Sequence, residues 1–254
     1  MKSALLLAAG KATRLKELRE QYAKACVPVG STTPLRFLMQ QLAAADVREI
    51  WVNLHWKAEQ VREQALQAAE VGVEVRFLEE PQLLGTGGTL LECYRQRGLM
   101  PDLVANAKQF GDVDFAALLQ QPAGSLVLHT QSALAEFGGL HFDEDRRISG
   151  LYPKTEAAKL NPESPTSCYA DPHNNPGGTA VYTGICRPDA AWITHLEKAR
   201  GQDPDGVLCM IRHGMLPAMA DGSTARAWLH HGQWCEVSTP ERVQAAERIH
   251  AALA

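Results

Sequence analysis

The sequence lacks an excess of positive charge. Its 254 residues include 25 Lys and Arg against 29 Asp and Glu, which gives a net charge of −4 and a pI near 6.1. Nucleic acids and anionic membranes favour proteins with a basic surface, so neither is expected as a partner. Any phosphate-binding site in this chain is therefore expected to be a local cluster of cations.

Paired cysteine motifs and long apolar runs are missing as well. The six cysteines are scattered with no Cys-x-x-Cys pair, which argues against a zinc site or a thioredoxin-like motif and favours reduced thiols. The first apolar run, residues 4–9, is too short for a signal peptide or a membrane span. No internal repeat or low-complexity segment is found. We therefore expect a cytoplasmic protein.

Apolar residues are present in a pattern typical of an α/β protein. The chain is 45% hydrophobic, enough for a sizeable core, and its length favours one domain over residues 1–254. Strand-like runs alternate with segments of helical spacing, which predicts a mostly parallel sheet with helices on both faces. The expected strands are residues 4–9, 49–54, 74–78, 125–130 and 179–186, with a hairpin at 140–151; the expected helices include 35–45, 57–69, 188–199 and 207–220.

The first thirty residues contain a candidate phosphate site. The first strand ends at Gly10, and Lys11, Arg14 and Lys24 follow. Small residues let the backbone approach an anion, so that the N–H groups of Ala8, Ala9, Gly10 and Lys11 can point at phosphate oxygens. Two anions that react repel one another, and cations on both sides of the reacting phosphorus offset this repulsion.

A second candidate segment is rich in glycine. Gly85, Thr86, Gly87 and Gly88 precede an expected helix through Leu90. A backbone with so few side chains permits a flat ligand to lie on it. The alternative is an ordinary helix N-terminus.

These segments carry a resemblance to a known family. The strings are LLLAAGKATRL at residues 5–15, AKACVPVG at 23–30, LGTGG at 84–88, TGI at 183–185 and WCEVSTPER at 234–242. They resemble the signature of the nucleotide-sugar pyrophosphorylases, nucleotidylyltransferases that join a sugar 1-phosphate to a nucleotide. Within this family the chain resembles the small uridylyltransferases that act on N-acetylmuramate 1-phosphate. The resemblance implies a three-layer α/β/α sandwich with a Rossmann-like, GT-A-like nucleotidyltransferase fold.

The resemblance also implies roles for individual residues. A phosphate or phosphonate oxygen of the acceptor would attack the α-phosphorus of an NTP and release pyrophosphate. Arg14 would hold the β- and γ-phosphates, and Lys24 would bridge the acceptor and the α-phosphate. The residues implied to bind the nucleotide are those of the two glycine-containing segments, 8–11 and 85–88, together with Asn106. Candidate acceptor contacts are Thr183, Gly184 and, in a long Pro- and Asn-rich loop, Lys154, His173 and Asn174.

The expected cofactor of the family is Mg²⁺, and here the chain departs from the family pattern. Lys108 stands where relatives have a metal-binding aspartate, and Glu236 stands at the second metal carboxylate. A lysine cannot ligate Mg²⁺, although it can supply a positive charge in its place. A shift of the alignment by four residues would instead make Asp112 the ligand. In the unshifted register, Lys108 and Glu236 are expected to face each other and form an ion pair.

Other departures and alternatives concern activity and local structure. Ala12 replaces a family glycine and Ser238 another, and Ser238 with Glu241 has the spacing of a helix capping box. His230 and His231 are expected to be structural.

Besides a nucleotidylyltransferase, the residues allow a catalytically degenerate binding protein or a transferase that uses an NDP-activated substrate. The nucleobase, the acceptor and the oligomeric state are left open.

Overall fold

The computed structural model describes residues 1–153 and 177–253. The predictions for Lys154, His173 and Asn174 lie outside these residues. Among the helices of the two described ranges, none combines the length and the apolar character that crossing a membrane requires.

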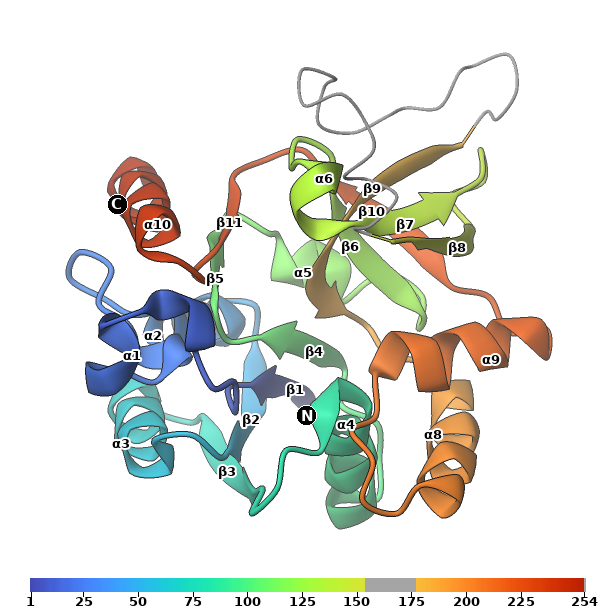
Figure 1. Ribbon diagram of the computed structural model, residues 1–254, viewed down its shortest axis with the longest axis horizontal. Helices are drawn as coiled ribbons and strands as arrows, with labels where there is room; N and C mark the ends of the chain where they lie inside the picture. Colours follow the sequence, from blue (N-terminus) through green and yellow to red (C-terminus); the bar gives the residue numbers. More distant parts are fainter. Residues whose placement is uncertain (154–176, 254) are drawn as a thin grey trace.

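The centre of the molecule is a mostly parallel sheet (Figure 1). Its strands run in the order β10-β6-β9-β4-β1-β2-β3. Strands β1 to β4 are parallel to their neighbours in this group, and β6 is parallel to β10. Strand β9 is antiparallel to both β4 and β6 and joins the two groups. The bounds are β1 (Lys2–Leu7), β2 (Val47–Leu54), β3 (Glu74–Glu79), β4 (Leu103–Asn106), β6 (Ser125–His129), β9 (Gly178–Cys186) and β10 (Arg226–His230).

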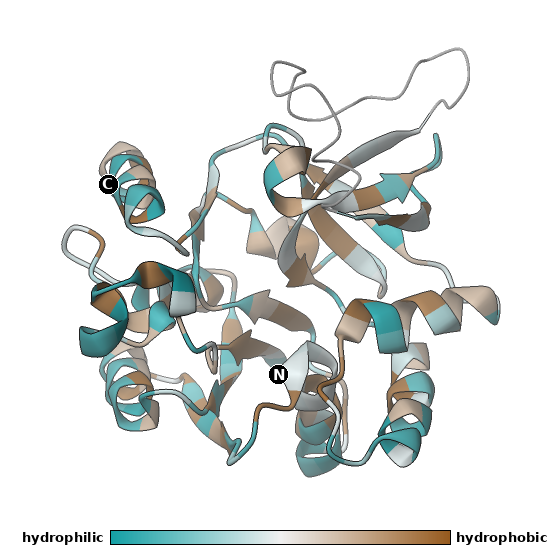
Figure 2. Cartoon of the chain, viewed as in Figure 1, coloured by the Kyte–Doolittle hydropathy of each residue, from teal (hydrophilic) through white to brown (hydrophobic). Residues whose placement is uncertain are grey.

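Helices cover both faces of this sheet, as the alternating pattern predicts. Ala4 and Leu6 of β1 belong to the apolar core on one face, whereas Leu5 belongs to the core on the other. Figure 2 shows apolar residues along the central strands and hydrophilic residues on the surrounding helices. The first face carries α2 (Pro34–Ala44), α3 (Ala58–Ala68) and α5 (Phe115–Leu118), and the second carries α4 (Gly85–Arg97), α8 (Ala191–Gln202) and α9 (Leu216–Ala220). The α/β prediction is confirmed.

The remaining elements lie around this frame. The predicted hairpin is confirmed as β7 (Gly139–Phe142) and β8 (Ile148–Tyr152). The predicted helix at 207–220 is wrong at its start, because Leu208 instead bonds through its backbone to Leu84 and Gly87 beside α4. A π-helical segment begins only at Met210 and leads into α9. Short helices are α1 (Leu18–Gln21) and α6 (Leu134–Phe137), and the chain ends in α10 (Pro240–Leu253).

A two-stranded sheet connects the C-terminal part to the middle of the chain. Strand β5 (Gln109–Gly111) pairs antiparallel with β11 (Trp234–Glu236), and Glu236 lies opposite Gln109. The side chains of this pair interlock, since the indole Nε1 of Trp234 donates to Oε1 of Gln109 at 2.8 Å. This pairing brings Glu236 next to Lys108.

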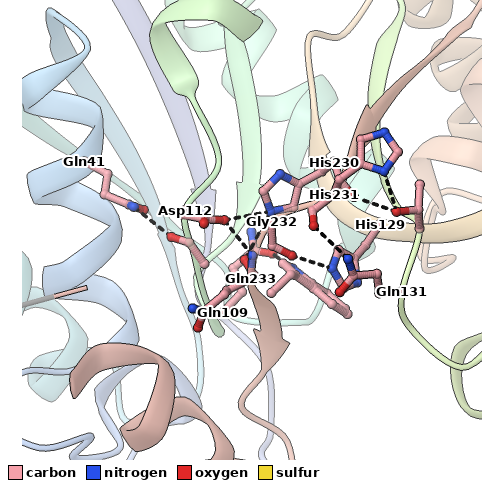
Figure 3. Close-up of polar contacts among 12 residues, drawn as sticks. Gln41, Gln109, Asp112, His129, Gln131, His230, His231, Gly232 and Gln233 are labelled. Atoms are coloured by element: carbon pink, nitrogen blue, oxygen red, sulfur yellow. Dashed lines mark hydrogen bonds and ion pairs between the residues drawn. The ribbon is translucent and has the colours of Figure 1, made fainter. Parts of the chain in front are cut away.

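Polar side chains hold the turn before β11 in place (Figure 3). Oδ1 of Asp112 accepts from the backbone N of Gln233 at 2.7 Å and lies 3.1 Å from Nε2 of His230. His231 turns elsewhere, with Nδ1 2.9 Å from the hydroxyl of Thr130. Asp112 is thus occupied in holding this turn and does not line the cavity described below. The prediction that Asp112 supplies a metal carboxylate is therefore wrong, and both histidines have structural contacts as predicted.

Gly184 in β9 illustrates how the junction of the two strand groups is built. Its φ of +84° is in the left-handed region, and a Cβ there would lie 2.7 Å from Cγ of Asn106. The absence of a side chain at Gly184 therefore lets the Asn106 amide lie against the strand.

We expect Gly184→Ala to destabilise the fold by about 1–3 kcal/mol. Alanine disfavours the positive φ at this position, and its methyl group would displace the Asn106 side chain. Gly150→Ala in β8 is the matched control, since a Cβ there meets nothing within 4 Å and φ is not positive. Urea unfolding measures both free energies. Equal losses in the two variants would contradict this account.

Candidate active site

A cavity of about 340 Å³ lies at the carboxyl ends of β1 and β4. The loop after β1 forms one wall and the start of α4 the other. This is the edge at which ligands bind in open parallel sheets. The predicted residues that line it are Ala8, Ala9, Gly10, Lys11, Arg14, Lys24, Gly85, Thr86, Asn106 and Lys108.

The loop after β1 offers fewer free backbone donors than the sequence predicts. The N–H groups of Ala8 and Ala9 both donate to Oδ1 of Asn53, at 2.6 and 3.2 Å. These two N–H groups are therefore engaged within the protein, although both residues line the cavity as predicted. Within the described residues, no hydrogen bond uses the N–H of Gly10 or Lys11. The available backbone donors thus begin at Gly10, two residues later in the chain than predicted.

Asn53 belongs to a buried polar network that the sequence analysis missed. Its Nδ2 donates to Oε1 of Glu80 at 2.8 Å and to the hydroxyl of Thr89 at 3.2 Å. Glu80 also accepts hydrogen bonds from the hydroxyl of Thr89 and from the N–H of Leu84. Asn53 is 4% and Glu80 3% exposed, so the partners satisfy groups that would be costly to bury alone. The network ties the loop after β1 to the start of α4.

The glycines at the start of α4 have different roles. Gly85 has a φ of +75° and, with Thr86, lines the cavity. Gly87 and Gly88 are buried on the far side, where a Cβ would lie 2.7 Å from Leu196 and from Arg200 respectively. The nucleotide-binding prediction for Gly87 and Gly88 is therefore not supported by their position. These two glycines allow α4 to pack closely against α8.

Three cations of the cavity converge on one carboxylate. Arg14 comes from a 3-10 turn (Thr13–Leu15), Lys24 from another (Lys24–Cys26), and Lys108 from the link between β4 and β5. Oε1 of Glu236 lies 3.1 Å from Nη2 of Arg14 and 3.8 Å from Nζ of Lys24. Oε2 of Glu236 lies 2.9 Å from Nζ of Lys108. The predicted Lys108–Glu236 ion pair is confirmed.

The pKa values follow from this crowding. Burial, and next the charge of Lys108, lower the pKa of Lys24 to about 7, although Glu236 acts in the opposite direction. Burial acts to raise the pKa of Glu236, but the charges of Lys108 and Lys24 outweigh it and hold this pKa at about 2. Three cations and one carboxylate leave the cluster with a net positive charge. The cavity is therefore suited to an anionic ligand.

Residues 3–172 match the sequence pattern of the nucleotidyl transferase family, which is two thirds of the chain. The chain belongs to this family.

Individual relatives agree with this assignment. The chain is 29% identical to the N-acetylmuramate alpha-1-phosphate uridylyltransferase of Caulobacter vibrioides, over 97% of this chain and 96% of that protein. It is also 29% identical to the enzyme of the same name from Neisseria meningitidis, over 52% of this chain and 57% of that protein. The fold is similar to that of a UDP-glucose pyrophosphorylase from Acinetobacter baumanii, with a TM-score of 0.74, 16% identity and coverage of 97% and 92%.

The side chains around Glu236 do not fit a magnesium site. Mg²⁺ is held in near-octahedral geometry by oxygen ligands, commonly one or two carboxylates with waters and phosphates. Here both oxygens of Glu236 face cations, and among the described residues no group of three His, Cys, Asp or Glu could hold a metal. The Mg²⁺ that the resemblance implies therefore has no matching ligand set in the described part of the family site.

Two further predictions are corrected by local contacts. The hydroxyl of Thr183 is buried and donates to the carbonyl of Val127 at 2.9 Å, so it fastens β9 to β6 instead of facing the cavity. Gly184 is likewise absent from the cavity wall. Helix α10 begins at Pro240, two residues beyond Ser238, whose hydroxyl accepts from Nη1 of Arg242 at 3.0 Å. Ser238 is therefore not part of a capping box.

We expect Glu236→Gln to lower the free energy of unfolding by about 1–3 kcal/mol at pH 7, because the three cations lose their counter-charge. The folded-state pKa of Glu236, about 2, lies below its ordinary value of 4.5. Its charge therefore stabilises the fold above about pH 4.5, and this contribution is lost as the pH falls towards 2. The difference between native protein and variant should narrow over the same interval.

Urea unfolding at pH 7, 5, 4 and 3 measures this difference. Glu247→Gln, which changes an exposed carboxylate on α10, is the control and should alter stability by less than about 0.5 kcal/mol. A loss in Glu236→Gln that stays constant with pH would contradict the charge-based explanation.

Proposed function

We propose that this protein transfers a nucleotidyl group from an NTP to the phosphate of a sugar 1-phosphate and releases pyrophosphate. The observation that carries the proposal is the convergence of Arg14, Lys24 and Lys108 at one cavity, between the Gly10 loop and the start of α4. The cavity volume falls within the usual range for small-molecule sites. Membership of the nucleotidyl transferase family supports the same reaction.

The proposed reaction is an in-line displacement at the α-phosphorus. An acceptor oxygen forms a bond to this phosphorus, the bond to the oxygen that links the α- and β-phosphates breaks, and pyrophosphate leaves with the electron pair. The acceptor phosphate is already ionised, so no general base is required. The main barrier is repulsion between the two anions, which positioned cations reduce.

The exposure of the cations suggests how they divide this task. Arg14 has a side chain that is 57% exposed, so we assign it to the β- and γ-phosphates at the mouth of the cavity. Lys24 is only 12% exposed and is assigned to the α-phosphate and the acceptor. Gly85 and Thr86 line the opposite wall and would contact the nucleoside.

The near full-length match to an N-acetylmuramate alpha-1-phosphate uridylyltransferase supports a narrower proposal. We propose UTP as the first nucleotide to test and N-acetylmuramate 1-phosphate as the first acceptor. A specific observation also favours a second candidate, nucleotide binding without turnover, because Glu236 already engages all three cations. Release of pyrophosphate identifies the first function, and binding without release identifies the second.

We expect pyrophosphate release when the protein is given UTP and N-acetylmuramate 1-phosphate. The other NTPs, and glucose and mannose 1-phosphates, complete the panel. Arg14→Ala and Lys24→Met should each lower kcat/KM by about 100-fold or more, since each removes a positive charge that would contact the reacting phosphates. Lys198→Met, which changes an exposed lysine on α8, should remain within about twofold of the native protein.

If no substrate pair releases pyrophosphate while nucleotide binding is intact, the transferase function is rejected and nucleotide binding without turnover is supported. Release of an NDP in place of pyrophosphate would indicate a transferase that uses an NDP-activated substrate. Full activity in both cation variants would show that the reaction takes place elsewhere on the protein.

A further inference from the structure

The carboxylate of Glu236 is surrounded on both oxygens by fixed cations. Lys108 contacts Oε2 at 2.9 Å, while Arg14 and Lys24 share Oε1. The side chains of Lys24 and Glu236 are 12% and 13% exposed, so water screens their charges only in part. A divalent cation that approached this carboxylate would meet three positive charges within a few ångströms.

Lys108 is held firmly beside Glu236. Its carbonyl accepts from the N–H of Val237 at 2.7 Å. The preceding N–H, that of Ala107, donates to the carbonyl of Leu7 at 3.1 Å, and the following residue, Gln109, pairs with Glu236 across β5 and β11. The backbone on both sides of Lys108 is therefore hydrogen-bonded, and from this backbone position the ammonium group reaches the Glu236 carboxylate.

Phosphate oxygens have the same charge and the same hydrogen-bonding role as the carboxylate oxygens of Glu236. A nucleotide in the cavity would therefore compete with Glu236 for the same three side chains. We propose that Lys108, with Arg14 and Lys24, binds the nucleotide phosphates without a protein-bound divalent cation, and that Glu236 balances these cations until the phosphates replace it. This inference deepens the proposed function and rests on it for the identity of the ligand.

In this role Glu236 competes with the nucleotide phosphates for the three cations. A carboxylate that ligates a metal would strengthen nucleotide binding, and its removal would weaken it. A carboxylate that occupies the phosphate-binding cations has the opposite effect, because its removal frees them. The sign of the change in affinity on Glu236→Gln therefore separates the two roles.

The experiment measures the Kd of UTP by calorimetry, in EDTA and in Mg²⁺, for the native protein and three variants. The native protein should bind UTP in EDTA with a Kd within about threefold of that in Mg²⁺. In EDTA, Glu236→Gln should bind about tenfold more tightly and Lys108→Met about tenfold more weakly. Lys198→Met is the control and should match the native protein. Circular dichroism verifies that each variant is folded.

A second measurement reports the metal directly. The electron paramagnetic resonance signal of free Mn²⁺ falls when the ion binds protein. The native protein should leave this signal unchanged, whereas Lys108→Asp, which places a second carboxylate beside Glu236, should reduce it. Any pyrophosphate release by the native protein should persist in EDTA.

Two results would overturn the inference: UTP binding that is lost in EDTA, or a Glu236→Gln variant that binds UTP more weakly than the native protein. Mn²⁺ binding by the native protein that disappears in Glu236→Gln would do so as well, since Glu236 would then be a metal ligand. Failure of the proposed function is distinguishable, because it removes pyrophosphate release under every condition while the binding measurements still give their own answer.

Discussion

The ion-pair cluster at Glu236 is the interaction on which the rest of the site depends. Its three cations come from residues 14, 24 and 108, and their shared counter-charge comes from residue 236. Without this carboxylate, three cations around a largely buried position would repel one another. The β5–β11 pairing places the carboxylate there, so a short sheet outside the main one supplies the counter-charge of the three cations.

The main sheet supplies the rest of the geometry. Parallel strands β1, β2, β3 and β4 end at one edge, so the loops that follow them meet there. Asn53 and Glu80 then link these loops through buried hydrogen bonds, from the N–H groups of Ala8 and Ala9 to Thr89 at the start of α4. The two walls of the cavity are thereby positioned by one continuous polar network, whose hydrogen bonds do not use Arg14, Lys24 or Lys108.

The sequence predicted the strands β1, β2, β3, β6 and β9, the β7–β8 hairpin and the alternation of strands with helices, whereas the short β5–β11 sheet was not predicted. Two signals identified Arg14, Lys24 and the Lys108–Glu236 pair. They are charged residues close to apolar strands, and the family motifs align with their positions. Backbone donors were harder to assign, since a free N–H in a motif can be taken by a distant residue, as Asn53 takes those of Ala8 and Ala9. The roles of the glycines were also hard to assign, because the sequence does not show which of them faces the cavity. Gly85 faces the cavity, whereas Gly87 and Gly88 serve the contact with α8.

The charges of the cluster are balanced only in part, and Lys108 pairs with Glu236 while it repels Lys24. Lys24 is buried among cations, and the pKa of its ammonium is lowered to about 7 chiefly by burial and by Lys108. A depressed lysine pKa means that the protonated form is destabilised in the folded state, so this group costs stability below its ordinary pKa. One carboxylate relieves only part of the repulsion, and the cluster remains positive. A phosphate anion in the cavity would relieve the remainder, so the repulsion among these cations favours the binding of an anion.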